Sequence, residues 1–156
     1  MEPYWDLIAR IINGSDLVLE ILDARFVELS RNEEVERLVK EIGRPLIFVV
    51  NKSDLISRNG LEKQISGLKN YGEVVFISSK NKKSTKILLY AIKKVFKKYG
   101  KREILENKIK GRKISYREAK AEIVVGVLGY PNVGKSSVIN ALAHKKKVKV
   151  SKKAGT

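Results

Sequence analysis

The stretch that most constrains the fold joins a short apolar segment to a glycine-rich loop. Ile123 to Leu128 is rich in β-branched residues, which is typical of a parallel strand buried on both faces. The loop that follows, Gly129 to Ser136, reads G-Y-P-N-V-G-K-S and fits the pattern G-x-x-x-x-G-K-S. Helical spacing of apolar residues resumes at Val138. Strand, loop and helix in this order predict a phosphate site at a helix start; a chance glycine-rich turn is the alternative.

The residue types in this loop suit the chemistry of phosphate binding. Glycines let backbone N–H groups turn toward an anion, and the helix N-terminus adds its positive end. Lys135 is expected to reach the β- and γ-phosphates, and the Ser136 hydroxyl is expected to bind Mg²⁺. We therefore predict catalytic roles for these two side chains. The nucleotide-binding residues predicted in this loop are Asn132, Val133, Gly134, Lys135, Ser136 and Ser137.

Three further apolar segments precede the phosphate loop, and each ends in polar residues. Together with the strand before the loop they predict a mainly parallel sheet with strands at residues 16–22, 45–50, 73–77 and 122–128. Ligands of open α/β sheets bind at the carboxyl ends of such strands. The polar residues after each strand are therefore candidates for the same site.

The second of these strands ends in Asn51-Lys52-Ser53-Asp54, which fits the N-K-x-D pattern for guanine. A carboxylate at Asp54 can accept from both N1–H and the 2-amino group of guanine, a pair that adenine does not offer. The Lys52 stem can lie on the face of the base, while Asn51 ties the loop to its neighbours. A solvated turn after a strand is the alternative reading of this four-residue pattern.

The third strand ends in Ser78-Ser79-Lys80, which fits an S-A-K type of loop. In such a loop the backbone N–H of Ser79 would meet the guanine O6, and Lys80 would pack near the base. Any polar turn could have this sequence, so the prediction depends on its place after a strand.

Helical segments are expected between these strands. The first covers residues 4–12 and places Trp5 toward the core, and a weaker one covers residues 61–68. A capping box, Ser30-x-x-Glu33, is expected to open a helix that ends at Ile42. Ser84 is expected to cap a helix that turns Leu88, Ala91, Ile92, Val95 and Tyr99 inward.

The charge of the chain is unevenly distributed. The formal net charge is +16: residues 1–79 carry 10 Lys/Arg against 13 Asp/Glu, whereas residues 80–156 carry 23 against 4. Such an excess favours a polyanionic partner, with an ordinary solvated face as the alternative. RNA contact is predicted along residues 82–120 and 145–153, chiefly at Lys93, Lys94, Lys97, Lys98, Lys145, Lys146 and Lys147.

Two classes of site are excluded by composition. The chain has no cysteine and one histidine, which leaves no disulfide, thiolate nucleophile or histidine-based metal cluster. No apolar run is long enough to span a bilayer, and the first residues are acidic rather than signal-like, so a cytoplasmic protein with no membrane partner is expected.

Taken together, the motifs resemble a GTPase of the Era/Ras superclass in which the guanine motifs precede the phosphate loop. That order resembles the circularly permuted GTPases of the YlqF/YawG type, which act in assembly of the large ribosomal subunit. A further match is D-A-R-F-V-E-L-S-R-N at residues 23–32, although Val27 replaces the usual proline, so no mechanism is taken from it. The resemblance implies a three-layer P-loop GTPase-like α/β fold over residues 1–156, with spatial strand order 4-1-2-3.

The resemblance also implies GTP or GDP and Mg²⁺ as ligands, and ribosomal RNA or a pre-ribosomal large subunit as partner. It places Thr156 at the switch threonine that binds Mg²⁺. Asn132 is expected to hold K⁺ as in potassium-activated relatives, or to be an ordinary turn asparagine. No D-x-x-G motif occurs in the 156 residues, so the domain is expected to be truncated in its first switch and to hydrolyse GTP weakly. The alternatives are an RNA-binding protein with a vestigial nucleotide site and an ATP-using P-loop enzyme such as a small kinase.

Overall fold

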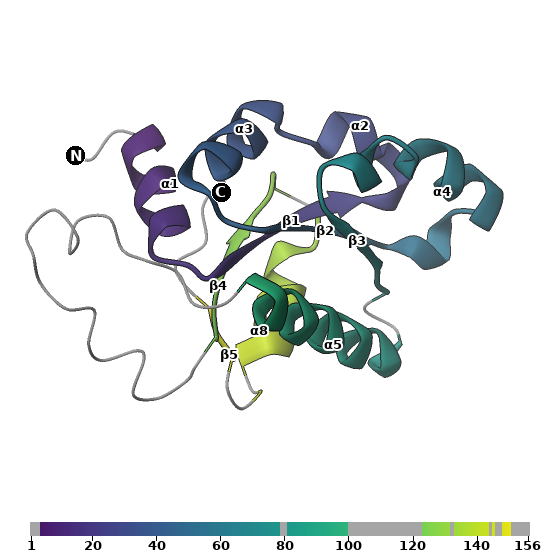
Figure 1. Cartoon of the computed structure of the whole chain (residues 1–156). Coiled ribbons are helices and arrows are strands. Elements are labelled where there is room, and N and C mark those ends of the chain that lie inside the picture. Colours follow the sequence, from purple (N-terminus) through teal and green to yellow (C-terminus); the bar gives the residue numbers. More distant parts are fainter. Residues whose placement is uncertain are drawn as a thin grey trace, which may run out of the picture.

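The computed structural model describes residues 4–78, 81–99, 123–131, 133–143, 145 and 148–150. Figure 1 shows a central sheet with helices on both of its faces. The elements are α1 (Tyr4–Asn13), β1 (Leu17–Asp23), α2 (Val27–Ser30), α3 (Glu33–Ile42), β2 (Leu46–Asn51), α4 (Arg58–Ile65), β3 (Glu73–Phe76), α5 (Lys82–Tyr99), β4 (Ile123–Leu128), α8 (Lys135–Ala143) and β5 (Val148–Val150). Short 3₁₀ turns lie at Ala24–Phe26, Ser53–Leu55 and Leu68–Asn70.

The sheet confirms the predicted topology and adds a strand to it. Its order is β3-β2-β1-β4-β5 with all four pairings parallel, so the last predicted strand does lie beside the first. The register places Val18 opposite Leu46 on one side and opposite Gly126 on the other. The added strand, β5, pairs Val148 with Ile123 at the edge of the sheet. Its alternation of valine with lysine is a typical edge-strand pattern, and the sequence interpretation missed it.

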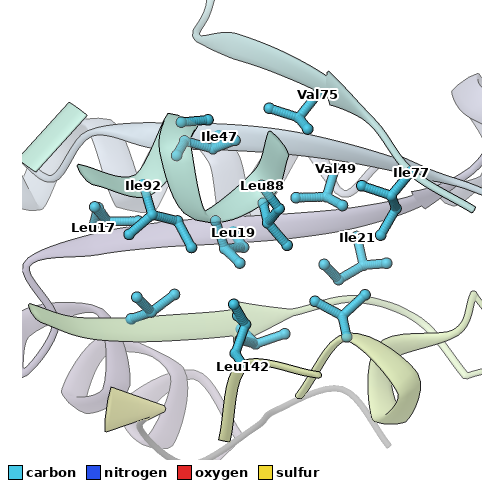
Figure 2. Packing of buried hydrophobic residues seen from close by; sticks show 14 of the residues in the cluster. Leu17, Leu19, Ile21, Ile47, Val49, Val75, Ile77, Leu88, Ile92 and Leu142 are labelled. Atoms are coloured by element: carbon cyan, nitrogen blue, oxygen red, sulfur yellow. The ribbon is translucent and has the colours of Figure 1, made fainter. Parts of the chain in front are cut away.

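Alternate residues of β1 point to opposite layers, because successive side chains of a strand point to opposite faces. Leu17, Leu19 and Ile21 pack against α5 and α8, where they meet Leu88 and Leu142. Figure 2 shows these side chains interleaved between the sheet and the two helices. Burying each such side chain stabilises the fold by about 1.5–3 kcal/mol. The apolar strands are therefore held from this side by two helices.

The other face of the sheet is covered in two parts. Val18 and Leu128 contact residues of α1 and α3 such as Ile12 and Val39. Phe48 and its neighbours contact Leu61 and Ile65 of α4 and Leu68 of the 3₁₀ turn that follows it. In Figure 1, α1 and α3 lie on the opposite side of the sheet from α5 and α8, which gives the three layers expected of this fold.

The predicted start of α3 is wrong by two residues. Asn32, not Ser30, is the N-cap: its side chain accepts a hydrogen bond from Val35 N at 3.1 Å. Ser30 instead ends the short helix α2, and its Oγ accepts from Asp23 N at 3.0 Å. The capping-box pattern failed because the hydroxyl is used by a backbone group that is distant in sequence. The predicted end at Ile42 is confirmed, with Gly43 in the left-handed region at φ 89°.

Helix α5 also begins earlier than expected. It starts at Lys82, and the Ser84 hydroxyl lies in its first turn and accepts from Ser78 N at 3.1 Å. Two aromatic side chains predicted to face the core are exposed instead, Trp5 at 41% and Tyr99 at 60%. Both lie near the end of a helix, where a neighbouring element no longer covers them.

Candidate nucleotide-binding site

The polar residues that follow β1, β2, β3 and β4 come together at the carboxyl edge of the sheet. Asp23 and Asn51 are register partners at the ends of β1 and β2. Ser53 N donates to Ile77 O at 3.1 Å, which joins the loop after β2 to the segment after β3. Because all these strands are parallel, their carboxyl ends share one edge. The predicted convergence of the loops is therefore present.

The phosphate loop leads from β4 into α8 through a left-handed glycine. Gly134 has φ 91°, a conformation that favours glycine because other residues lack room for Cβ there. A Cβ at this position would also collide with the Asn51 side-chain amide. Lys135 begins α8, and its buried side chain donates from Nζ to Gly129 O at 3.0 Å. The ammonium therefore lies over the loop that its own residue closes.

Asn51 connects the two predicted halves of the site. Its side chain is buried and donates from Nδ2 to Val133 O at 3.0 Å, across 82 residues of sequence. A hydrogen bond of this kind fixes the loop after β2 against the phosphate loop. Its Oδ1 is also buried and accepts no hydrogen bond from the described residues. One amide thus holds the two loops at a fixed separation.

The loop after β2 presents Asp54 to solvent. Lys52 has φ 62°, the left-handed conformation that is rare for a residue with a side chain. This turn leads into the 3₁₀ helix Ser53–Leu55, in which Asp54 is exposed. Ser53 anchors the loop because its Oγ donates to Ile77 O at 2.9 Å. Asp54 is therefore carried on an anchored turn, with its carboxylate accessible to a ligand.

A charged cluster at the end of β1 supports the same loop. The buried Asp23 carboxylate accepts from Arg25 Nε at 3.0 Å and from Lys52 Nζ at 3.2 Å. The Arg25 guanidinium, aided by Lys52, holds the pKa of Asp23 well below its usual range although burial opposes this. Asp23 is therefore an anion at all ordinary pH values, and it orients the lysine that precedes Asp54.

A family model described as 50S ribosome-binding GTPase matches residues 124–156. GTP-binding protein MJ1464 of Methanocaldococcus jannaschii is 40% identical over 154 residues, which cover 98% of this chain and 35% of that protein. GTPase grn1 of Schizosaccharomyces pombe is 35% identical over 142 residues, covering 87% of this chain and 29% of grn1. The structure of GDP-bound YlqF has TM-score 0.59 and 19% identity, covering 96% of this chain and 57% of YlqF.

The chain is similar to GTP-binding proteins, and its fold is that of a circularly permuted GTPase structure. Similarity to the GTP-binding proteins extends over nearly its whole length, and the loop after β2 precedes the phosphate loop on a sheet of the expected order. The chain spans about a third of the length of the two curated relatives. Among the described residues, no helix is long and apolar enough to cross a membrane.

The structure describes most of the predicted site residues and places them at the carboxyl edge of the sheet. Val133 and Gly134 touch Asn51, and Ser78 lies after β3. Ser136 and Ser137 are exposed in the first turn of α8. Four predicted ligand contacts fall outside the described residues: Ser79, Lys80, Asn132 and Thr156.

The structure adds two residues to the candidate site, Asp23 and Arg25. The sequence signal for them was the D-A-R segment, from which no role was taken. Of the residues predicted to contact RNA, the four on α5 and Lys145 are exposed, whereas Lys146 and Lys147 lie outside the described residues.

Proposed function

We propose that this chain binds GTP and GDP at the carboxyl edge of its sheet, as the nucleotide module of a GTPase that converts GTP to GDP and phosphate. The observation that carries the proposal is the 3.0 Å hydrogen bond from Asn51 Nδ2 to Val133 O. It joins a loop suited to the guanine base and a loop suited to phosphates. A nucleotide has its base and phosphates covalently linked, so it can occupy both loops only where their spacing is fixed.

The phosphate end of the proposed site rests on the start of α8. The left-handed turn at Gly134 makes room for the Asn51 amide that ties the two loops, and the helix N-terminus that follows favours negative charge. On phosphate binding, Lys135 would exchange Gly129 O for phosphate oxygens. A charge-assisted hydrogen bond of this kind is stronger than one to a neutral carbonyl.

The base end of the proposed site rests on Asp54. Its exposed carboxylate can accept from N1–H and the 2-amino group of guanine. Adenine has no hydrogen at N1 and no 2-amino group, so it would leave the carboxylate unsatisfied. An unsatisfied polar group in such a contact costs about 1–3 kcal/mol. Asp54 would therefore select guanine over adenine.

Mg²⁺ fits the residues of the proposed site, since the Ser136 hydroxyl is accessible in the first turn of α8. We expect Ser136 to hold the ion, with Thr156 as a second ligand and K⁺ near Asn132. Bound Mg²⁺ would supply charge neutralisation for the phosphates. The buried Lys135 would add its own positive charge at the same place.

Hydrolysis requires more groups than binding does. Phosphoryl transfer depends on positioning and charge stabilisation around the γ-phosphate, and it also needs a water held in line. The 156 residues contain no D-x-x-G motif, which by resemblance closes on the γ-phosphate region. We expect these residues to bind GDP and GTP with similar affinity and to hydrolyse GTP slowly.

The proposed setting is large-subunit assembly in the cytoplasm, with ribosomal RNA or a pre-ribosomal particle as partner. Support comes from the match to the 50S ribosome-binding GTPase model and from the one-sided positive charge. The second candidate is an RNA-binding protein with a vestigial nucleotide site. That candidate keeps the lysines and does not need the bond between Asn51 and Val133.

Isothermal titration of the chain with GDP, GTP and ADP in Mg²⁺ and K⁺ tests the nucleotide proposal. GDP and GTP should bind with similar affinity and far more tightly than ADP. Equal affinity for ADP and GDP would overturn guanine selection, and no binding of any nucleotide would favour the vestigial site. Single-turnover GTP hydrolysis on the same protein should stay close to background, and rapid turnover would show that the catalytic groups lie within these residues.

A further inference from the structure

A second groove lies at the amino edge of the sheet, away from the proposed nucleotide site. Its lining includes Leu46 and Glu73, the first residues of β2 and β3, and residues at the C-terminal ends of α3 and α5. Its volume is about 680 Å³, within the usual range for ligand sites. The proposed nucleotide site occupies the carboxyl ends of the same strands. The two sites can therefore be occupied together.

The groove carries an excess of positive charge. Its lining contains six Lys and Arg against three Glu residues. Two of the carboxylates are already paired, Glu36 with Arg31 at 2.7 Å and Glu73 with Lys94 at 3.4 Å. No ion pair within the described part of the chain involves the lining cations Arg37, Lys40 and Lys98. These three remain available to a polyanion.

Tyr71 and Tyr99 line the same groove, and both present an aromatic ring to solvent. Tyr71 is 63% exposed and Tyr99 is 60% exposed. The Arg31 guanidinium lies 5.6 Å from the Tyr71 ring, and Lys98 Nζ lies 5.4 Å from the Tyr99 ring. The two bonds from Arg31 to Glu36 fix that guanidinium, so the ring beside it rests on a fixed support. Exposed aromatic rings next to cations are the combination that stacks unpaired bases.

The backbone of the groove disfavours a simple phosphate cradle. The groove runs along α3 from Glu33 to Gly43 and also includes the end of α5, and the C-terminus of a helix carries partial negative charge. A small anion would meet these carbonyl groups, whereas a nucleic acid strand can place bases on the rings and phosphates on the long cationic side chains. A single-stranded nucleic acid therefore suits both the exposed rings and the long cationic side chains.

We infer that this groove binds an unpaired segment of RNA, with bases stacked on Tyr71 and Tyr99 and phosphates near Arg37, Lys40 and Lys98. The inference rests on the proposed RNA partner and adds to it a site, a strand preference and a stacking mode. Duplex RNA cannot offer its base faces to the rings, because they are stacked inside the helix. The groove therefore distinguishes unpaired from paired RNA.

The test is fluorescence anisotropy with a labelled oligouridine of about 12 nucleotides and with a duplex RNA of the same length. The unmutated chain should bind the single strand more tightly than the duplex. Tyr71→Leu with Tyr99→Leu should weaken single-strand binding about 10-fold or more, since stacking is lost at two positions. Tyr71→Phe with Tyr99→Phe should retain binding, because both rings remain. Tyr90→Leu is the matched control, since Tyr90 is an exposed tyrosine of α5 that does not line the groove.

Each other outcome has a definite meaning. Three results would overturn the proposal that the groove binds unpaired RNA. These are unchanged single-strand affinity in the double Leu variant, an equal loss of affinity in Tyr90→Leu, and tighter binding of the duplex. No binding of either RNA by the unmutated chain would overturn the RNA partner and the groove together. GDP titration on each variant reports folding and the nucleotide site independently. If the unmutated chain does not bind GDP, the nucleotide proposal is refuted, and the RNA measurements still test the groove.

Discussion

Glu20 is a single acidic residue in the middle of β1, where every residue is buried. Its Oε2 accepts from Asn32 N at 2.9 Å, which fixes the start of α3. Its Oε1 accepts from no donor in the described part of the chain. Burial, followed by the hydrogen bond and charge of Glu36, raises the pKa of Glu20 to about 9. A protonated Glu20 can donate to the Glu36 carboxylate, so the folded state favours the neutral acid.

Glu20→Gln should change how stability depends on pH. The pKa of Glu20 rises from 4.5 to about 9 on folding, so between these values the folded state binds the extra proton. The free energy of unfolding should then fall as pH rises through that range, by up to about 1.4 kcal/mol per pH unit. The amide mimics the neutral acid and should remove this contribution. Urea unfolding at pH 5 to 8.5 measures it, with Glu34→Gln on the exposed face of α3 as control. Equal pH slopes in Glu20→Gln and the unmutated chain would refute the buried neutral acid.

Gly134→Ala adds one methyl group to the phosphate loop and should weaken nucleotide binding. An alanine at φ 91° costs about 1–2 kcal/mol, and its Cβ would also displace the Asn51 amide that joins the two loops. Nucleotide affinity should fall by at least 10-fold, because the loops lose their fixed spacing. GDP titration together with thermal unfolding checks this.

Gly67→Ala is the matched control for Gly134→Ala. Gly67 has φ −77°, and an added Cβ there meets nothing within 4 Å. It should leave both the melting temperature and GDP affinity nearly unchanged. If Gly134→Ala behaved in the same way, the described loop geometry would not govern binding.

At the scale of elements, the four predicted strands are present because each combines an apolar run with a polar stop, and both signals are local in sequence. The helix starts were less predictable. Ser30 fits a cap by spacing, yet its hydroxyl accepts from Asp23, seven residues away, and Asn32 caps instead. Local pattern does not contain such contacts between elements. For the same reason the bond from Asn51 to Val133 could be expected only as a general tie between loops.

Helix α5 bears four of the lysines that are predicted to contact RNA. Its lysines at 93, 94, 97 and 98 are all exposed, as the spacing predicted. Reversing these four charges to glutamate should flatten the slope of log affinity against log salt, because each lost phosphate contact removes about 0.7–0.9 from it. GDP affinity should hardly change, since the proposed nucleotide site is elsewhere.

The salt titration has a control on another surface. Arg58 and Lys63 are exposed on α4, and reversing them should leave the RNA salt slope nearly unchanged. If the RNA affinity of the unmutated chain did not depend on salt, the α5 lysines would form an ordinary solvated face. An equal flattening in both sets would indicate a general charge effect rather than a surface on α5.

At the scale of the whole molecule, one parallel sheet separates two candidate surfaces. The loop after β2 and the phosphate loop lie at the carboxyl edge, and the groove with Tyr71 and Tyr99 lies at the amino edge. Permutation preserves this arrangement because the spatial order of the strands, not their chain order, brings loops together. The sequence indicated the first surface through its motifs. It indicated the second only through Lys94 and Lys98, which were predicted to contact RNA; it gave no signal for Tyr71, and it predicted Tyr99 to face the core.

If the loop after β2 and the phosphate loop form one guanine nucleotide site, a change at Asp54 should alter which base that site prefers. GDP and xanthosine diphosphate should be titrated into the unmutated chain, Asp54→Asn and the control Glu62→Gln, which changes an exposed carboxylate of α4. Xanthine has a carbonyl where guanine has its 2-amino group, so an amide can donate to it and a carboxylate cannot. The unmutated chain and Glu62→Gln should prefer GDP, and Asp54→Asn should prefer xanthosine diphosphate, with a change of about 1–3 kcal/mol in relative affinity. An unchanged preference in Asp54→Asn would mean that Asp54 does not contact the base and that the loop after β2 is not part of the nucleotide site.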